Sequence, residues 1–407
     1  MSTIAPAAQK SSPDVAGGHR RLTLLLGALA AMGPFTIDAY LPSFRDIGRT
    51  FDATPELVQQ TMTSYLVPFA VMTLWHGALS DTYGRRRVTL VCVALFALAS
   101  LGCMMAWSIG SLVFFRALQG ASVGAGTVIG RAIVRDVFDG AEARRLMSTI
   151  ALLFAVAPAV GPIIGGWLQV AFGWRSVFVF LTVFAVLVWV ACWKALPETL
   201  PVERRQPLHA GSLLSGYGEV LRSGPFLALV VALTMNFAAN FLYVVSAPAF
   251  VFHALQRSET EFYWLFGPLT AGMMLGNVAA VRLAARWTHR RMLVAGYTVM
   301  GLAAAANVFF HLHHAAELPW SVLPLGVFAF GVTLTMPSLT LMALDLFPER
   351  RGLAASCQSF VQTGGNALVA AFLAPALWAT AHELSVGMMA LFAAGLVAVL
   401  LFARRAR

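Results

Sequence analysis

Charge is scarce in this chain. Only 11% of the 407 residues are charged, whereas 59% are hydrophobic and the mean hydropathy is +0.76. A soluble domain of this size carries about a quarter charged residues, so the composition excludes an ordinary soluble globular protein. Apolar runs of about 20 residues recur along nearly the whole length, and each is long enough to cross a bilayer as a helix. The sequence therefore predicts an all-α integral membrane protein.

Cysteine and catalytic motifs are scarce as well. The four cysteines fall inside apolar runs without a CxxC pattern, which is typical of buried free thiols rather than of a disulfide framework. The sequence has no nucleotide-binding loop, metal-protease pair or Ser-His-Asp order, so we expect no enzyme, no cofactor and no metal site. The net charge of +10 lies in short arginine clusters between apolar runs, a distribution that does not favour nucleic acid as a partner.

Hydropathy predicts twelve transmembrane spans in two sets of six, separated by the polar stretch LPETLPVERRQPLHAGS. The predicted spans are 22–45, 56–80, 88–107, 110–137, 144–171, 174–195, 223–252, 260–284, 291–311, 320–346, 352–378 and 384–403. The corresponding domains are a tail at 1–20, a six-helix bundle at 21–195, a linker at 196–222, a second six-helix bundle at 223–403 and a tail at 404–407. Such a duplication is typical of transporters in which two bundles rock around a central site.

The positions of the basic residues predict the orientation. Of the 28 Lys and Arg residues, four fall in the loops on one side, two lie within the fourth span, and the remaining 22 flank the other side. By the positive-inside rule, the side with 22 basic residues faces the cytoplasm. We therefore expect both termini and the central linker to be cytoplasmic.

Asp38 and Arg116 are the two charges that lie deepest in the predicted bilayer. Each costs about 2.5–3.5 kcal/mol at a helix centre on insertion scales, so a charge kept there is a candidate functional residue. We predict that the two residues serve proton coupling, with Asp38 taking a proton from the periplasm and releasing it to the cytoplasm in competition with substrate. The alternatives are that Asp38 forms a constant ion pair with Arg116 or faces outer water, and that Arg116 is purely structural.

Polar side chains recur at helical spacing in the seventh and eleventh spans. Residues four and seven or eight apart share one helix face, so each trio faces either a water-filled cavity or another helix, and the spacing leaves both open. Aromatic side chains would add apolar walls for hydrophobic substrates. The predicted substrate cavity is lined by Tyr40, Tyr65 and Phe154, by Asn236, Asn240 and Tyr243, and by Gln358, Gln362 and Asn366.

Several short motifs resemble those of one family of transporters. GALSDTYGRRR (77–87) resembles the loop signature G-x-L-x-D-x-x-G-R-[KR] of the major facilitator superfamily. RALQGASVGAG (116–126) resembles the fourth-helix signature of its proton-coupled members, and APAVGPIIGG (157–166) the fifth-helix signature of its antiporters. With DAYLP in the first span and FGWRSVF at 172–178, the whole chain resembles the twelve-helix drug:proton antiporters of the Bcr/CflA branch.

The resemblance implies a cytoplasmic gate at the first of these motifs. There Arg85 would pair with Asp136, and Asp81 would face the positive start of another helix, for which the eleventh span near Gly352 is our candidate. The alternative is that the basic cluster only enforces topology. The predicted gate residues are Gly77, Asp81, Gly84, Arg85, Arg86 and Asp136.

The fifth-span motif is rich in glycine and proline, which permit close helix approach and bending. Because the eighth span has a similar composition, we expect a sealing hinge where these two spans meet between the halves, with ordinary helix packing as the alternative. The predicted hinge residues are Pro158, Gly161, Pro162, Gly165 and Gly166.

The resemblance implies an antiporter of major facilitator fold in the bacterial inner membrane. We expect it to export small, largely hydrophobic drugs by alternating access, to work without a cofactor, and to be driven by the proton gradient. Its expected partners are the drug substrate, protons and the lipid bilayer, and we expect a monomer. The alternatives are export of a native metabolite, such as an amino acid or sugar derivative, with incidental drug resistance, and a non-transporting membrane sensor.

Overall fold

The computed structural model describes residues 13–138 and 140–405, apart from the side chains at 13–20, at 405 and at several positions between 140 and 155. Within these ranges every regular element is a helix. Ten segments are long and apolar enough to cross a membrane, and two further long helices occupy the places of the remaining predicted spans. The predicted all-α membrane architecture is therefore confirmed.

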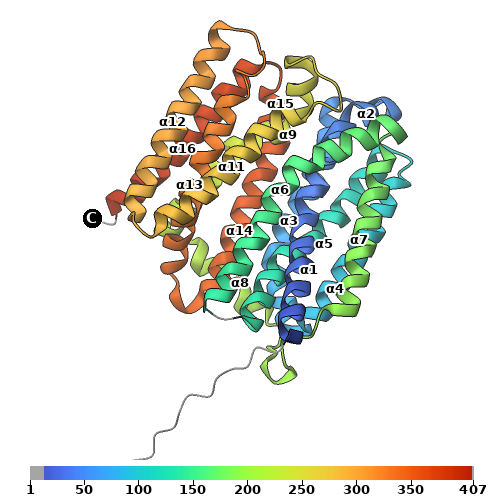
Figure 1. The fold of residues 1–407 in the computed structure, drawn as a ribbon, viewed down its shortest axis with the longest axis vertical. Coiled ribbons are helices and arrows are strands. Elements are labelled where there is room, and N and C mark those ends of the chain that lie inside the picture. The colour runs from blue at the N-terminus through green and yellow to red at the C-terminus, as the bar shows by residue number, and fades with distance from the viewer. Residues whose placement is uncertain (1–12, 139, 406–407) are drawn as a thin grey trace, which may run out of the picture.

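Two groups of six long helices make up the molecule, and they lie side by side in Figure 1. The N-terminal half holds α1 (Pro13–Asp38), α3 (Pro55–Tyr83), α4 (Arg85–Met104), α5 (Ile109–Val137), α6 (Gly140–Phe172) and α7 (Arg175–Ala195). The C-terminal half holds α9 (Gly224–Val245), α11 (Tyr263–Ala284), α12 (His289–His313), α13 (Leu323–Asp345), α14 (Arg351–Leu368) and α16 (Ala381–Arg405). Helix α3 packs against α14, and α6 packs against α11, so these four helices join the halves.

Short elements interrupt or connect the long helices. They are η1 (Leu41–Ser43), α2 (Phe44–Phe51), η2 (Val202–Arg204), α8 (Ala210–Leu221), α10 (Ala247–Ala249), η3 (Phe250–Ala254), η4 (Pro348–Arg350), η5 (Val369–Leu373) and α15 (Ala374–Leu377). The predicted first, seventh and eleventh spans are therefore not single straight helices. Turns follow α1 and α9, and the π-helical turn η5 lies within the eleventh span, where a widened turn frees backbone groups for other partners.

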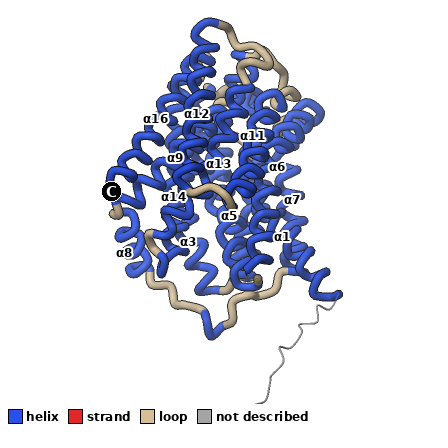
Figure 2. Tube along the Cα trace, turned by 60° about the vertical axis from the view of Figure 1, so that its left-hand side comes forward, coloured by secondary structure: helices blue, strands red, loops and turns tan. Residues whose placement is uncertain are grey.

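Most loops gather at the two ends of the bundle, as the tube in Figure 2 shows. We call the end that carries residues 196–209 and α8 the linker end, and the opposite end, where α1 and α9 finish, the far end. Local capping fixes where several helices begin. Thr54 accepts a hydrogen bond from the Leu57 amide at the start of α3, and Ser108 forms a capping box with Ser111 at the start of α5.

Glycines let helices of the same half approach to backbone contact. A Cβ atom on Gly120 of α5 would overlap the carbonyl of Tyr65 in α3, and one on Gly272 of α11 would overlap the carbonyl of Gly326 in α13. Small residues of this kind are what membrane helices use in place of a hydrophobic driving force between them. Each half is therefore closely packed internally.

Several contacts join the two halves at the far end. The amide of Gln59 in α3 donates to the carbonyl of Ala370 in η5 at 3.1 Å, and the Arg45 guanidinium lies 5.9 Å from the Phe252 ring centroid. One apolar cluster also runs across the halves there, from Tyr40 of the first to Phe250 of the second. The far end is therefore closed in this structure.

Candidate functional site

Asp38 is the last residue of α1 and only 3% of it is exposed. It lies against α6, where a Cβ atom on Gly161 would come within 3.0 Å of the Asp38 Cβ. Among the residues that the structure describes, none gives the Asp38 carboxylate a hydrogen bond or an ion pair. A buried carboxylate without a partner is costly in its charged form, so Asp38 can lower its energy by binding a proton or a cation.

Arg116 of α5 is completely buried and has its own set of partners. Its guanidinium donates to the carbonyls of Thr36 and Thr61, both at 3.3 Å, and to Oε1 of Gln119 at 3.0 Å. The Tyr40 and Tyr65 ring centroids lie 4.6 and 4.5 Å from its central carbon. Two aromatic faces and three acceptors thus stabilise the buried cation without a carboxylate.

The two deep charges therefore do not form an ion pair with each other. The sequence placed them at similar depth, but depth does not determine which way each side chain points around its helix. Arg116 points toward α3 and the carbonyls of α1, whereas Asp38 lies against α6. The alternative of a constant Asp38–Arg116 ion pair is wrong for this conformation.

Tyr40 and Tyr65 lie beside the charges rather than along an open cavity. Both are fully buried; the Tyr40 hydroxyl is 2.7 Å from the Thr61 hydroxyl, and the Tyr65 hydroxyl donates to the carbonyl of Gly33 at 3.3 Å. Gln119, which the sequence reasoning missed, continues this network by donating to the Ser100 hydroxyl at 2.7 Å. Its position three residues after Arg116 on one helix face is the signal that would have found it.

The polar trio of α9 divides between two surroundings. Asn236 donates to the Tyr297 hydroxyl of α12 at 2.8 Å, and the Tyr243 hydroxyl accepts from Asn307 of the same helix at 2.8 Å. These two residues join helices inside the C-terminal half, which favours the interhelical interpretation for both. The side-chain oxygen of Asn236 has no partner in the described structure, so a cavity-lining role for Asn236 stays a prediction. Asn240 is 6% exposed and has no hydrogen bond to the described residues, so it remains a candidate lining residue.

The trio of α14 is less tightly held. Gln358 donates to the Thr340 hydroxyl of α13 at 3.2 Å, whereas its own carbonyl oxygen and that of Asn366 are buried without a partner in the described structure. Gln362 is partly exposed. Unpaired buried carbonyls are expected to bind water or ligand groups, so a cavity-lining role remains a prediction for this trio. The side chain of Phe154 lies outside the part of the chain that the structure describes.

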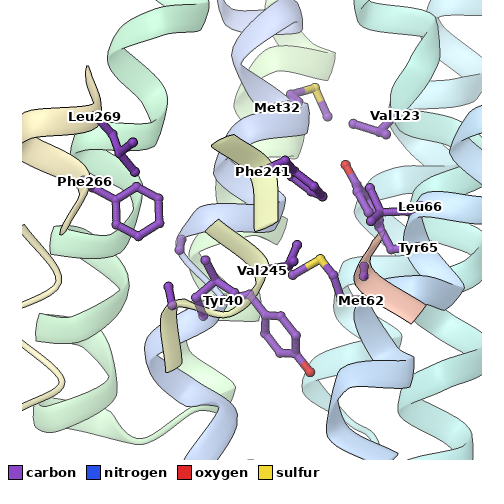
Figure 3. Close-up of a cluster of buried hydrophobic side chains, with 14 of the residues drawn as sticks. Met32, Tyr40, Met62, Tyr65, Leu66, Val123, Phe241, Val245, Phe266 and Leu269 are labelled. Atoms are coloured by element: carbon purple, nitrogen blue, oxygen red, sulfur yellow. The ribbon is translucent and has the colours of Figure 1, made fainter. Parts of the chain in front are cut away.

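Apolar side chains from both halves meet beside Asp38 and Arg116. Figure 3 shows Phe241 of α9 pointing toward Tyr65 and Leu66 of α3, with Val245 next to Met62. The sequence predicted that the polar residues of α9 line the substrate cavity. In the structure, the residues of α9 that face the N-terminal half are Phe241 and Val245. The side chains that meet between the halves beside these charges are therefore mainly apolar and aromatic.

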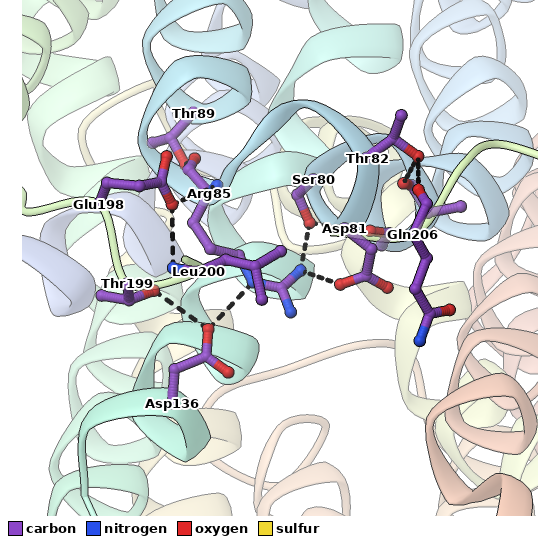
Figure 4. Close-up of polar contacts among 12 residues, drawn as sticks. Ser80, Asp81, Thr82, Arg85, Thr89, Asp136, Glu198, Thr199, Leu200 and Gln206 are labelled. Atoms are coloured by element: carbon purple, nitrogen blue, oxygen red, sulfur yellow. Dashed lines mark hydrogen bonds and ion pairs between the residues drawn. The ribbon is translucent and has the colours of Figure 1, made fainter. Parts of the chain in front are cut away.

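At the linker end, Arg85 is the centre of a charged network, drawn in Figure 4. Its guanidinium lies 3.1 Å from Asp136 and 2.5 Å from Asp81, and it donates to the Ser80 hydroxyl at 2.6 Å. The predicted pairing of Arg85 with Asp136 is present. Asp81 pairs with Arg85 of its own half, and that it faces the start of the eleventh span stays a prediction.

The gate glycines have different surroundings. Gly84 has a φ of 96°, which side chains rarely adopt, and lets α3 turn directly into α4. Gly77 has only ordinary contact with Val128. Arg86 donates to the carbonyl of Trp193 at 2.7 Å and so ties α4 to α7.

The linker completes this network, which the sequence reasoning did not foresee. Glu198 accepts from the Arg85 amide at 2.9 Å, and Thr199 donates to Asp136 at 3.0 Å. Farther along, the Tyr217 hydroxyl of α8 donates to the carbonyl of Leu74 at 2.6 Å, and burial raises the pKa of Tyr217 to about 12, which keeps that donor protonated. The linker thus contacts the loop between α3 and α4 through Glu198, and α8 contacts α3 through Tyr217.

The fifth-span glycines pack mainly within their own half. Gly161 and Gly165 lie against Asp38 and Ala39, and only Gly166 meets the C-terminal half, at the backbone of Glu259. Pro158 and Pro162 lie inside the continuous helix α6. The predicted contact of the fifth and eighth spans exists, but Gly161 and Gly165 serve the packing of α6 on α1. A role as a hinge remains a prediction for Gly166 and the prolines.

Known proteins similar to this chain agree with its fold. The family model described as Major Facilitator Superfamily matches residues 23–370 and 229–407. An uncharacterised transporter of that type, YdgK of Bacillus subtilis, is 34% identical over 83% of this chain and 85% of its own length. Multidrug resistance protein D of Escherichia coli is 27% identical over 87% of this chain and 88% of its own length.

One further relative and one solved structure are also similar to this chain. A bicyclomycin resistance protein homolog of Haemophilus influenzae is 33% identical over 55% of this chain and 56% of its own length. The structure of the xylose transporter XylE from E. coli matches 95% of this chain and 98% of its own, with a TM-score of 0.72 and 13% identity. The predicted resemblance to drug:proton antiporters is confirmed by these relatives, and the chain belongs to the major facilitator superfamily.

Proposed function

We propose that this protein exports small, largely hydrophobic drugs across the bacterial inner membrane in exchange for protons. The observation that carries the proposal is Asp38, a buried carboxylate without a partner in the described structure, next to an apolar surface shared by both halves. Relatives named for multidrug and bicyclomycin resistance support drugs as the substrate class. The positive-inside distribution supports a cytoplasmic linker end and cytoplasmic termini.

The proposed cycle follows from the cost of an unpaired buried charge. While the far end is closed, Asp38 is stable when protonated and unstable when charged. Opening toward the periplasm lets Asp38 take up a proton. Opening toward the cytoplasm lets a drug and the surrounding water favour the charged form, so the proton leaves as the drug enters. Arg116 stays in its aromatic and carbonyl cage and sets the positive potential near the site.

The proton gradient is a sufficient energy source. One charge that crosses 100 mV releases roughly 2.3 kcal/mol, and each pH unit adds roughly 1.4 kcal/mol. Together these sustain a drug gradient on the order of several hundredfold. No nucleotide or other cofactor is needed in the proposed mechanism, and one chain holds every residue that it uses.

Substrate-induced proton release tests this proposal. Purified protein in weakly buffered detergent solution is mixed with candidate drugs, and a pH-sensitive dye reports released protons. We expect release from the wild type and none from Asp38→Asn. The matched control is Glu56→Gln, which changes an exposed carboxylate at the start of α3 and should leave the release intact.

Transport in proteoliposomes extends the test. With an imposed pH gradient, the wild type should accumulate the drug and Asp38→Asn should only equilibrate it. Normal proton release and uphill transport by Asp38→Asn would contradict the proposal, and transport of an amino acid or sugar derivative in preference to every hydrophobic drug would replace the substrate class.

A further inference from the structure

A groove on the side of the N-terminal half is not used by the proposed transport mechanism. It lies between α3, α4 and α5, has a volume of about 600 Å³, and is lined almost entirely by apolar side chains. Several of these are among the most exposed apolar residues of the protein: Val91 is 53% exposed, Leu95 52% and Leu98 64%. In a membrane-spanning chain, such mid-helix residues face lipid, so the groove opens toward the bilayer.

The groove ends in a basic mouth at the linker end. A second hollow there is lined by Arg86, Arg87 and Arg205 together with Glu198, and it shares Arg87 and Val91 with the groove. Glu198 lies 3.8 Å from Arg205 and cancels one of the three positive charges. Arg87 is exposed and makes no hydrogen bond or ion pair with any described residue. The mouth therefore carries net positive charge with a free guanidinium.

The length of the groove matches one leaflet of a bilayer. Its lining on α4 runs from Arg87 to Ala99, which is roughly 18 Å along a helix axis. The hydrocarbon core is about 30 Å thick, so one leaflet is about 15 Å deep. A groove that starts at a basic mouth and ends near mid-membrane has the dimensions of a lipid chain and its headgroup, whereas a compact drug would leave one end empty.

We propose that this groove binds one anionic phospholipid of the cytoplasmic leaflet. An acyl chain lies between α3, α4 and α5, and the phosphate binds Arg87 with help from Arg86 and Arg205. The inference rests on the cytoplasmic orientation of the linker end proposed above. Because Glu198 also accepts a hydrogen bond from the Arg85 amide, the bound headgroup lies next to the loop that joins α3 and α4.

Lipid retention by the purified protein tests this inference. Full-length protein is exchanged into detergent with phosphatidylglycerol or phosphatidylcholine, and native mass spectrometry measures the bound lipid. We expect one retained phosphatidylglycerol and little phosphatidylcholine. A basic residue near a membrane surface contributes about 1 kcal/mol, so Arg87→Gln should weaken retention roughly fivefold and Arg86→Gln with Arg87→Gln roughly 25-fold.

Three controls make the result specific. Arg290→Gln with Arg291→Gln removes an exposed basic pair at the start of α12 and should retain phosphatidylglycerol like the wild type. Leu98→Trp enlarges an exposed side chain that lines the far part of the groove and should lower retention although every arginine is present. Inorganic phosphate should not displace the lipid, because the acyl chain holds it.

Four results would each overturn the inference. Two concern the variants: an equally large loss in the Arg290 and Arg291 variant, or unchanged retention in the Arg86 and Arg87 variant. The other two are equal retention of both lipids and displacement of the lipid by phosphate alone. Orientation is measured separately, by labelling Glu203→Cys in the linker with a membrane-impermeant maleimide on intact cells and on inverted vesicles. Labelling from outside the cell would refute the proposed orientation, while the retention experiment would still decide whether the groove binds the lipid.

Discussion

Helix α6 packs closely on α1 beside Asp38, and Gly165 is the position there where one added methyl group should destabilise the protein most. A Cβ atom there would lie 2.7 Å from the carbonyl carbon of Ala39 and 2.9 Å from its Cα atom. Ordinary contact between carbon atoms is about 3.5–4.0 Å, so α6 would have to move roughly 1 Å away from α1. Both neighbours are backbone, which cannot rotate aside as a side chain can.

We expect Gly165→Ala to destabilise the protein by about 1–3 kcal/mol, the usual cost of overpacking. Gly161→Ala should cost less, because its Cβ would meet the Asp38 Cβ at 3.0 Å and a small adjustment relieves it. Gly267→Ala in α11 is the matched control, since nothing lies within 4 Å of its added Cβ. That change should be neutral or stabilise by up to about 1 kcal/mol.

Unfolding in mixed detergent and SDS, followed by far-UV circular dichroism, measures this series, and drug transport is measured on the same preparations. We expect the order of stability Gly267→Ala, wild type, Gly161→Ala, Gly165→Ala, and the transport loss to follow the displacement of α6 from Asp38. Equal stability of Gly165→Ala and Gly267→Ala would show that α6 does not pack on α1 as described and would refute the reasoning.

Two further predictions concern the two ends of the bundle. Asp136→Asn removes the charge that binds Arg85 and Thr199, and we expect it to lower the free energy of unfolding by about 1.5–3 kcal/mol. Asp345→Asn breaks an exposed ion pair with Arg351 and should lower it by at most about 1 kcal/mol in the same unfolding assay. Equal losses in the two variants would contradict the structure. At the far end, hydrogen bonds from the Ser258 amide and hydroxyl hold the pKa of Glu261 below its usual range. The stability that these hydrogen bonds contribute is present above the ordinary glutamate pKa of about 4.3 and is lost as pH falls through the lower folded value. The wild type should therefore be more stable than Glu261→Gln at neutral pH, and this difference in stability should vanish on acidification. A difference that grows in acid would refute the assignment.

Much of the fold can be predicted from the sequence because the position of each helix depends mainly on a local run of apolar residues. A span needs about 20 apolar residues whatever surrounds it, so the runs of hydropathy predicted most of the long helices to within a few residues. The helices of the first, seventh and eleventh spans end earlier than predicted, at Asp38, Val245 and Leu368. The pairing of Arg85 with Asp136 was also predictable, through the resemblance of the loop and fourth-helix motifs. The breaks after Asp38 and Val245 were not, because the surrounding residues are as apolar as the helices.

The candidate site was harder to predict because it depends on direction around each helix. The spacing of Asn236 and Tyr243 puts them on one face of the helix, but spacing alone gives no sign of which neighbouring helix that face meets. The structure turns it toward α12 and turns Phe241 toward the N-terminal half. The same ambiguity left open a pairing of Asp38 with Arg116, whose guanidinium instead lies between two tyrosine rings.

The separation of these two charges bears on how a proton can be coupled to movement of the halves. If Asp38 were paired with Arg116 in the closed far end, its charge would be stable there and no proton would be needed. Without a partner, the carboxylate is destabilised wherever the apolar contact of Phe241 and Val245 with the N-terminal half excludes water. Closing the far end on a charged Asp38 is therefore unfavourable, and closing it on a protonated Asp38 is not. Because the apolar contact between the halves excludes water, the far end closes readily only when Asp38 is protonated. Replacing Asp38 by Asn should therefore allow the far end to close at any pH.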